Sequence, residues 1–289
     1  MGYLFFVSLI WAFSFGLIKG NLSGVDSTFV AFGRMLIAAL VFLPLLRFKK
    51  VDRKTAAKLA LTGLLQFGIM YIAYLAAFKN LKAYEVALFT IFTPIFVTLI
   101  DDVFSRRFNL LHLMVALISV AGTWIIEGES ATSPGVISGF LLVQLSNLCY
   151  AFGQIYYRRI MAELPGLKDR EVFGYLYLGA LVVTGLATLV FTPLGSLTLT
   201  TKQLATILYL GAIASGLSFF LWNIGARRVN TGTLAVFNDL KIPLAVAVSL
   251  LVFGETTNIP RLLIGGAIIL AALLINEWVS RTSKLKQVS

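Results

Sequence analysis

The sequence predicts an all-α integral membrane protein in which ten transmembrane helices form two inverted five-helix repeats. Three observations support this fold class. Hydrophobic residues make up 58% of the 289 positions and charged residues only 13%, which is about half the charged fraction of a soluble domain. The apolar residues gather into ten runs of membrane-spanning length. Finally, residue patterns in the first half recur in the second half.

The ten predicted spans follow one another through short connections. They cover residues 2–19, 28–46, 56–78, 84–100, 110–126, 135–157, 172–192, 203–226, 231–253 and 260–279. The longest connection, 158–171, contains Pro165-Gly166, a pair that favours a loop. Connections this short are what a multi-span protein without an extramembrane domain requires.

The distribution of Lys and Arg predicts the orientation in an inner or plasma membrane. If the N-terminus is cytoplasmic, 17 of the 24 basic residues fall on the cytoplasmic side: Arg47, Lys49, Lys50, Arg53, Lys54, Lys58, Arg106, Arg107, Arg158, Arg159, Lys168, Arg170, Arg227, Arg228, Arg281, Lys284 and Lys286. Only five fall on the other side: Lys19, Lys79, Lys82, Lys202 and Arg261. This bias predicts that both termini are cytoplasmic. Because the cations cluster between apolar runs, the net charge of +11 indicates topology and not a nucleic-acid partner.

Internal repetition divides the chain into two units. The segment Tyr74–Ala77 precedes Trp222–Gly225 by 148 positions, and Pro94 precedes Pro243 by 149. Trp11-Ala-Phe likewise recurs as Tyr150-Ala-Phe. We therefore predict a first repeat over 1–130, a second over 131–280 and a cytoplasmic tail over 281–289. Because five spans is an odd number, the second copy must be inverted, as is typical of secondary transporters with a solute site between the repeats.

Several segments also resemble a known family. The first is Trp11-Ala-Phe-Ser14-Phe15, followed by Lys19. The second is Arg34 ahead of Met35-Leu-Ile-Ala-Ala-Leu, with Pro44. The third is Pro243, followed by Phe253-Gly254-Glu255 and Ile264-Gly265. Together they resemble the EamA family of the drug/metabolite transporter (DMT) superfamily over nearly the whole chain. The resemblance implies a ten-helix inverted-repeat, DMT-like fold and export of amino acids, their derivatives and other small metabolites across the bacterial inner membrane. Ser105, followed by Arg106-Arg107, stands where the first repeat often has a Gly-Glu pair, which suggests a structural or loop-capping part for Glu255.

The sixth predicted span carries a stripe of polar residues. A polar side chain inside a membrane costs free energy unless it faces protein or a water-filled cavity. Helical spacing places the stripe on one face, and its members are Gln144, Asn147 and Gln154, with Tyr150 and Tyr157 beside them. The stripe predicts either hydrogen bonds between helices or one wall of a solute cavity. In the family that the chain resembles, this helix lines the central path.

Aromatic and amide side chains on other spans extend the candidate solute site. They are Trp11 and Ser14 on the first span, Gln66 and Tyr74 on the third, Trp222 and Asn223 on the eighth, and Asn238 on the ninth. Rings with a few amides suit small zwitterions, because aromatic faces attract ammonium groups. The alternative is that individual aromatic residues only pack or face lipid.

Charged residues within the spans differ in their predicted depth. Lys19, Arg34 and Glu85 fall near the predicted outer ends, where long cations can reach the interface and where Arg34 and Glu85 could form a structural pair. Asp239 lies deeper, about eight residues into the ninth span, and is a candidate for contact with a solute or a coupling proton or for holding a partner helix. Lys241 is two residues further on and lies on another face of the same helix.

Pro94 and Pro243 occupy matching points of the fourth and ninth spans. Proline removes a backbone hydrogen bond and tends to kink a helix. The pair predicts two hinges that work while one bundle rocks against the other, or two static bends.

The sequence contains no catalytic motif, metal-ligand spacing or cofactor-binding loop, so we predict neither an enzyme nor a cofactor. We predict a secondary transporter that moves small polar metabolites, above all amino acids or their derivatives, by alternating access and in the export direction. The alternatives are a channel and, less favoured, a membrane-embedded enzyme acting on lipid-linked substrates. The expected partners are a small-molecule substrate and the lipid bilayer, and the fifth and tenth spans leave a homodimer open.

Overall fold

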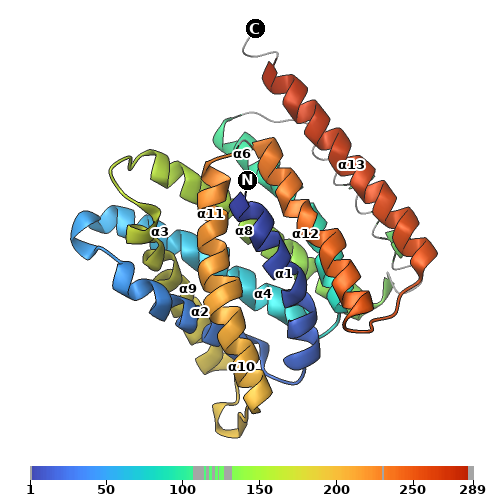
Figure 1. Ribbon diagram of the computed structural model, residues 1–289, viewed down its shortest axis with the longest axis horizontal. Coiled ribbons are helices and arrows are strands. Elements are labelled where there is room, and N and C mark those ends of the chain that lie inside the picture. Colours follow the sequence, from blue (N-terminus) through green and yellow to red (C-terminus); the bar gives the residue numbers. More distant parts are fainter. Residues whose placement is uncertain are drawn as a thin grey trace.

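The computed structural model describes residues 2–106, 114, 117–118, 121–122, 124–126, 132–229 and 231–285. Throughout these residues the regular elements are helices, and they pack side by side in a bundle (Figure 1). The predicted fifth span, 110–126, lies mostly outside the described residues.

In the first half, two of the four described spans are interrupted helices. The chain forms α1 (Gly2–Asn21), α2 (Ser27–Phe42), η1 (Leu43–Leu45), η2 (Phe48–Lys50), α3 (Arg53–Gly63), η3 (Leu64–Ile69), α4 (Met70–Ala77), α5 (Ala83–Phe89), η4 (Thr90–Phe92) and α6 (Thr93–Phe104). The third span changes from α-helix to π-helix in η3 and back again. The fourth span is broken by a single 3₁₀ turn, η4.

The second half has a similar order of elements. It forms α8 (Pro134–Ala162), α9 (Asp169–Phe191), η6 (Leu194–Ser196), α10 (Thr201–Tyr209), η7 (Leu210–Leu217), α11 (Ser218–Arg227), α12 (Thr231–Leu251) and α13 (Ile259–Leu285). The π-helical segment η7 interrupts the eighth span much as η3 interrupts the third.

The lengths and compositions of the helices are those of a multi-pass membrane protein. In the described part of the chain, seven helices are long and apolar enough to cross a membrane: Gly2–Asn21, Ser27–Leu45, Arg53–Ala77, Ala83–Phe104, Pro134–Ala162, Asp169–Phe191 and Thr201–Arg227. Lys241–Leu251 and Ile259–Ala272 are shorter apolar helices. Large apolar side chains such as Leu189 and Leu263 are exposed on the outside of the bundle, where lipid would cover them. The total of ten spans stays a prediction.

Figure 1 places the start of α1 and the end of α13 toward the same end of the bundle. An even number of crossings would give this arrangement. Which end faces the cytoplasm stays a prediction from the basic residues.

Contacts between the halves follow a reciprocal pattern. Helix α1 packs against α11 and α12, while α8, its counterpart by sequence, packs against α4 and α6. Helix α2 packs on α9 and on η7, while α9 packs on α2 and on η3. Reciprocal pairs of this kind are expected if the chain is one unit used twice, which stays a prediction.

Helices α3 and α9 approach each other closely through two glycines. A Cβ built on Gly63 would lie 1.8 Å from the carbonyl oxygen of Leu176, and one on Gly179 would lie 1.8 Å from that of Ala60. Small residues allow such backbone contact between membrane helices. This contact joins the third span to the seventh.

Two side chains that the sequence places near span ends have structural contacts. Glu255 accepts hydrogen bonds from the backbone nitrogens of Ala83 (2.8 Å) and Tyr84 (3.0 Å) and from the Ser249 hydroxyl. It therefore caps the start of α5, which confirms the loop-capping part predicted for it. Lys19 Nζ donates to the carbonyl oxygens of Phe78 (2.7 Å) and Leu81 (2.8 Å), just beyond the end of α4.

Candidate functional site

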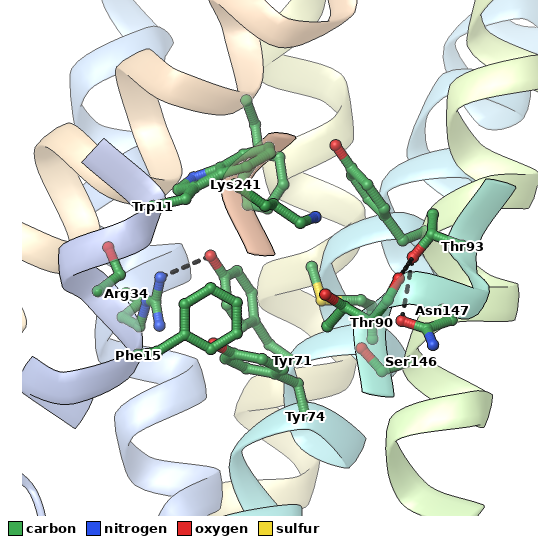
Figure 2. Close-up of a pocket in the computed structure, with 14 residues that line it drawn as sticks. Trp11, Phe15, Arg34, Tyr71, Tyr74, Thr90, Thr93, Ser146, Asn147 and Lys241 are labelled. Atoms are coloured by element: carbon green, nitrogen blue, oxygen red, sulfur yellow. Dashed lines mark hydrogen bonds between the residues drawn. The ribbon is translucent and has the colours of Figure 1, made fainter. Parts of the chain in front are cut away.

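A pocket lies in the middle of the bundle, where α1, α2, α4, α8, α11 and α12 meet the break in the fourth span (Figure 2). Five of the residues predicted for the solute site line it, namely Trp11, Ser14, Tyr74, Asn147 and Tyr150. The structure therefore brings these five residues together, and their contact with a solute stays a prediction.

Aromatic rings form one part of the pocket wall. The Trp11 ring lies 4.9 Å from that of Phe219 and 6.1 Å from that of Tyr150, measured between centroids. Phe15 and Tyr74 are 5.9 Å apart and nearly perpendicular. Trp11 is also fixed by a hydrogen bond of 2.8 Å from Nε1 to the carbonyl oxygen of Ala214 in η7. The rings are therefore packed against one another and against backbone, which gives the pocket rigid apolar walls.

Arg34 is buried in this wall, with 2% of its surface exposed. Its Nε donates to the Ser215 hydroxyl (3.0 Å), its Nη2 donates to the Tyr71 hydroxyl (2.6 Å), and its guanidinium carbon lies 4.1 Å from the centre of the Tyr71 ring. Within the described part of the chain, Nη1 is buried and has no hydrogen-bond partner. A guanidinium is charged at any physiological pH. The pocket therefore has a fixed positive charge with one donor nitrogen available.

The sequence-based expectation for Arg34 was wrong in two respects. Arg34 points into the bundle and does not extend to the interface, and it does not pair with Glu85. Glu85 accepts instead from the backbone nitrogen of Lys82 (2.8 Å) and from the Tyr84 hydroxyl (3.0 Å). Helix α2 packs against α9 and η7. In this orientation about its axis, α2 directs Arg34 inward.

Lys241 is the second cation that lines the pocket, and the sequence reading gave it no role. It is buried, and its Nζ lies 5.2 Å from the centre of the Trp11 ring and 5.5 Å from that of Tyr150. Both distances are within cation–π range. Its position inside a predicted span was a sufficient signal, because ionisable residues at such depth are functional candidates by default.

Hydroxyl and amide groups line the part of the pocket opposite Arg34 (Figure 2). Thr90 and Thr93 come from the broken fourth span, and Ser146 and Asn147 come from α8. Thr93 donates to Asn147 Oδ1 (3.2 Å), and Asn147 Nδ2 donates to the carbonyl oxygen of Phe89 (2.9 Å). Both interpretations of the sixth-span stripe therefore apply to Asn147, which joins two helices and also faces the pocket.

Four predicted residues do not line the pocket but lie buried next to it, and they form two hydrogen-bonded pairs: Gln66 with Asn223, and Trp222 with Gln154. Gln66 Nε2 donates to Asn223 Oδ1 (3.3 Å), and Trp222 Nε1 donates to Gln154 Oε1 (2.9 Å). These bonds connect α11 with the third span and with α8. A direct contact of these four residues with solute stays a prediction.

The remaining predicted residues lie on α6 and α12. Asn238 is buried, and its Nδ2 donates to the carbonyl oxygen of Leu234 (3.1 Å) within α12. Asp239 belongs to the same helix, but its side chain lies outside the described part of the structure. Pro94 stands in the first turn of α6, directly after the 3₁₀ break, whereas Pro243 lies inside α12. The two prolines thus differ in structural setting, and their part as hinges stays a prediction.

Comparisons with known proteins agree on the family. The model of the EamA-like transporter family matches residues 1–128 and 137–277. A "probable biotin transporter" of Pseudomonas aeruginosa is 42% identical over 279 residues, which cover 96% of this chain and 97% of the relative. A "biotin transporter" of Salmonella typhimurium is 38% identical, with 98% and 95% covered. A "probable amino-acid metabolite efflux pump" of that organism is 25% identical, with 98% and 96% covered.

A solved structure, described only as a crystal structure of a protein, has the same fold. It superposes with a TM-score of 0.69 at 19% identity and covers 96% of this chain and 97% of that chain. The family and the names of the relatives indicate a transporter rather than an enzyme. With a family model that matches nearly the whole sequence, this chain belongs to the EamA-like transporter family.

Proposed function

We propose that this protein is a carrier for biotin, or for an organic monocarboxylate built like it, and that it works by alternating access. The names of the relatives that are 38% and 42% identical support the choice of solute. The observation that carries the proposal is Arg34, whose Nη1 is buried and without a partner among the described residues. A solute carboxylate is the group that this nitrogen would bind.

The geometry of Arg34 favours an anion over a neutral solute. Two of its nitrogens are held by Ser215 and Tyr71, so the side chain is positioned before the solute arrives. Leaving a buried donor unpaired costs about 1–3 kcal/mol, more for a charged group, and a carboxylate would remove that cost. Lys241 adds a second positive charge to the same pocket, and the described lining residues include no Asp or Glu.

The rest of the wall fits the apolar part of such a solute. Phe15, Met70, Tyr74 and Phe219 line the pocket, and apolar walls with a few placed polar groups are typical of small-molecule sites. Biotin combines a carboxylate, a hydrocarbon chain and a compact ring system. The aromatic wall would cover the chain and the rings.

Amino acids and their derivatives, exported from the cell, are the second candidate. The relative that is 25% identical and named as an amino-acid metabolite efflux pump supports them. A zwitterion needs a partner for its ammonium group, and aromatic faces can serve. In this pocket, however, the faces of Trp11 and Tyr150 already hold Lys241. Biotin is therefore the better fit.

Transport by the purified protein in proteoliposomes tests the proposal. We expect saturable entry of labelled biotin that unlabelled biotin inhibits and that amino acids do not. Arg34→Gln should abolish this entry, whereas Arg53→Gln, at an exposed arginine at the start of α3, should leave it unchanged. Entry no faster than into empty liposomes, or stronger inhibition by an amino acid than by biotin, would rule the proposal out. Efflux from preloaded vesicles measures the export direction.

A further inference from the structure

The polar side of the pocket, opposite Arg34, has a distinctive hydrogen-bonding character. It is formed by Thr90 and Thr93 at the break in the fourth span and by Ser146 and Asn147 on α8. Figure 2 shows these four residues facing Arg34 across the pocket, with Phe15, Tyr71 and Tyr74 lying between the two sides. We call these four residues the acceptor side.

Most donor hydrogens of the acceptor side are already used within the protein. The Thr90 hydroxyl donates to the carbonyl oxygen of Ala87 (2.7 Å), and the Thr93 hydroxyl to that of Thr90 (2.7 Å). Asn147 Nδ2 donates to the Phe89 carbonyl oxygen (2.9 Å) and to Gln144 Oε1 (3.1 Å). A hydroxyl has one donor and two acceptor lone pairs. The threonines therefore offer lone pairs to the pocket.

The broken span explains this arrangement. Pro94 has no N–H to donate to the carbonyl oxygen of Thr90. This oxygen accepts instead from the backbone N–H and from the hydroxyl of Thr93. The Thr93 hydroxyl hydrogen therefore points to the Thr90 carbonyl oxygen (2.7 Å) or is shared with Asn147 Oδ1 (3.2 Å). In both cases it is used within the protein, and the hydroxyl oxygen is left to accept from a solute.

The Tyr150 hydroxyl is a second, independent sign that this side of the pocket binds a polar group. Tyr150 lines the pocket, and its hydroxyl is buried without a hydrogen-bond partner among the described residues. Buried hydroxyls are normally paired. Its O–H is therefore available as a donor to a ligand oxygen.

We propose that the acceptor side recognises the cyclic urea of the solute, while Arg34 holds its carboxylate. This inference rests on the proposed biotin transport. A cyclic urea has two N–H donors and one carbonyl acceptor. Thr90 and Thr93 would accept from the N–H groups, and Tyr150 would donate to the carbonyl. Arg34 then selects for any monocarboxylate, and the acceptor side selects those with a urea ring.

Competition on the wild-type protein tests this division without any substitution. Desthiobiotin keeps the urea and the carboxylate, whereas lipoate keeps the carboxylate and chain but lacks the urea. We expect desthiobiotin to displace labelled biotin at concentrations close to those of biotin itself. Lipoate should need at least about a hundredfold more, because a site built to hydrogen-bond a group strongly rejects an analogue without it. Equal competition by lipoate would overturn the inference.

Thr90→Val and Thr93→Val test the two residues, and Thr98→Val is the matched control. Thr98 lies on the same span, but its hydroxyl bonds the carbonyl oxygens of Pro94 and Ile95 and does not line the pocket. We expect each of the first two variants to weaken biotin binding about tenfold while lipoate binding stays the same, so that the preference for biotin falls. Thr98→Val should change neither affinity.

The outcomes separate this inference from the proposed function. If folded Thr90→Val and Thr93→Val proteins, checked by thermal unfolding, kept wild-type affinity for biotin, the urea assignment would be wrong and biotin transport would stand. If the wild-type protein bound no biotin, both would be wrong. Loss of biotin and lipoate binding together would also contradict the assignment, because Thr90 and Thr93 should not act on lipoate, which lacks the urea.

Discussion

The guanidinium of Arg34 has donors that point in several directions, and the protein uses two of its nitrogens to position the third. Ser215 and Tyr71 hold Nε and Nη2, and Nη1 is buried without a partner among the residues that the structure describes. A fork of fixed geometry can perform this double task because its donors sit on separate atoms. This one side chain therefore determines which charge on a solute the pocket accepts.

Arg34→Lys should weaken biotin binding about 10- to 100-fold although it conserves the charge. An ammonium carries its three donors on one atom and cannot reach Ser215, Tyr71 and a carboxylate in the same geometry. Equilibrium binding of labelled biotin to detergent-solubilised protein measures the loss. Tyr71→Phe, which keeps the ring under the guanidinium, should cost less than about tenfold. Full affinity in Arg34→Lys would mean that charge alone matters.

Arg106 and Gly254, which are 148 positions apart, share a left-handed backbone conformation, with φ values of 52° and 66°. A side chain with a Cβ costs about 1–2 kcal/mol in this conformation, and glycine avoids that cost. Arg106→Gly should therefore raise the free energy of unfolding by about 1 kcal/mol, and Gly254→Ala should lower it by a similar amount. Denaturant unfolding in detergent measures both. Arg106→Ala, which keeps the Cβ, should give no gain; a gain equal to that of Arg106→Gly would point to charge removal instead.

At the scale of elements, the links between helices from different halves hold the bundle together. Asp26 is an example: it caps α2, and its Oδ1 also accepts from the hydroxyl of Thr192 at the end of α9 (2.6 Å). Thr188 of α9 adds a hydrogen bond to the carbonyl oxygen of Thr28 (3.1 Å). One carboxylate thus fixes the start of α2 to the end of α9.

Asp26→Ala should lower the free energy of unfolding by about 0.5–2 kcal/mol, the usual cost of losing an N-cap.

Partial burial opposes ionisation, but hydrogen bonds from Thr192 and Thr28 together hold the pKa of the Asp26 carboxyl below its usual value of 3.8. A lowered folded-state pKa stabilises the protein above the unfolded-state pKa, and this stability is lost as pH falls through the folded-state value. The difference in unfolding temperature between wild type and Asp26→Ala should therefore be constant near neutral pH and shrink below about pH 4. A difference that persists there would exclude this carboxylate as its cause.

At most span ends, the boundary predicted from the sequence lies within a few residues of the boundary in the structure. The sequence did not predict the breaks inside the spans. The fourth span was expected over 84–100 and runs from Ala83 to Phe104, with an unpredicted 3₁₀ turn at Thr90–Phe92. A hydrophobic run indicates which part of the chain leaves water. Whether its helix contains a π or 3₁₀ segment depends on hydrogen-bond partners that are distant in the sequence. In η7, the carbonyl oxygens of Ala214 and Ser215 accept from Trp11 and Tyr177 (2.8 Å each), and neither donor is near in sequence.

At the scale of the whole molecule, the pocket belongs to both halves. Arg34 and Thr93 come from the first half, and Asn147, Phe219 and Lys241 come from the second. The sequence placed the candidate site between the repeats and named Trp11, Tyr74 and Tyr150 of this lining, but it did not name Phe15, Tyr71 or Phe219. It did not predict that both buried cations would point there, since the rotation of each helix depends on the packing of its neighbours.

A site shared by two halves predicts carrier kinetics. If the halves move against each other to open one side at a time, a continuous pore never forms. Vesicles preloaded with unlabelled biotin should then take up labelled biotin several-fold faster than empty vesicles, because the loaded carrier returns with solute. Arg34→Gln vesicles should show no such stimulation. A flux that neither saturates nor responds to internal biotin would identify a channel and would contradict alternating access.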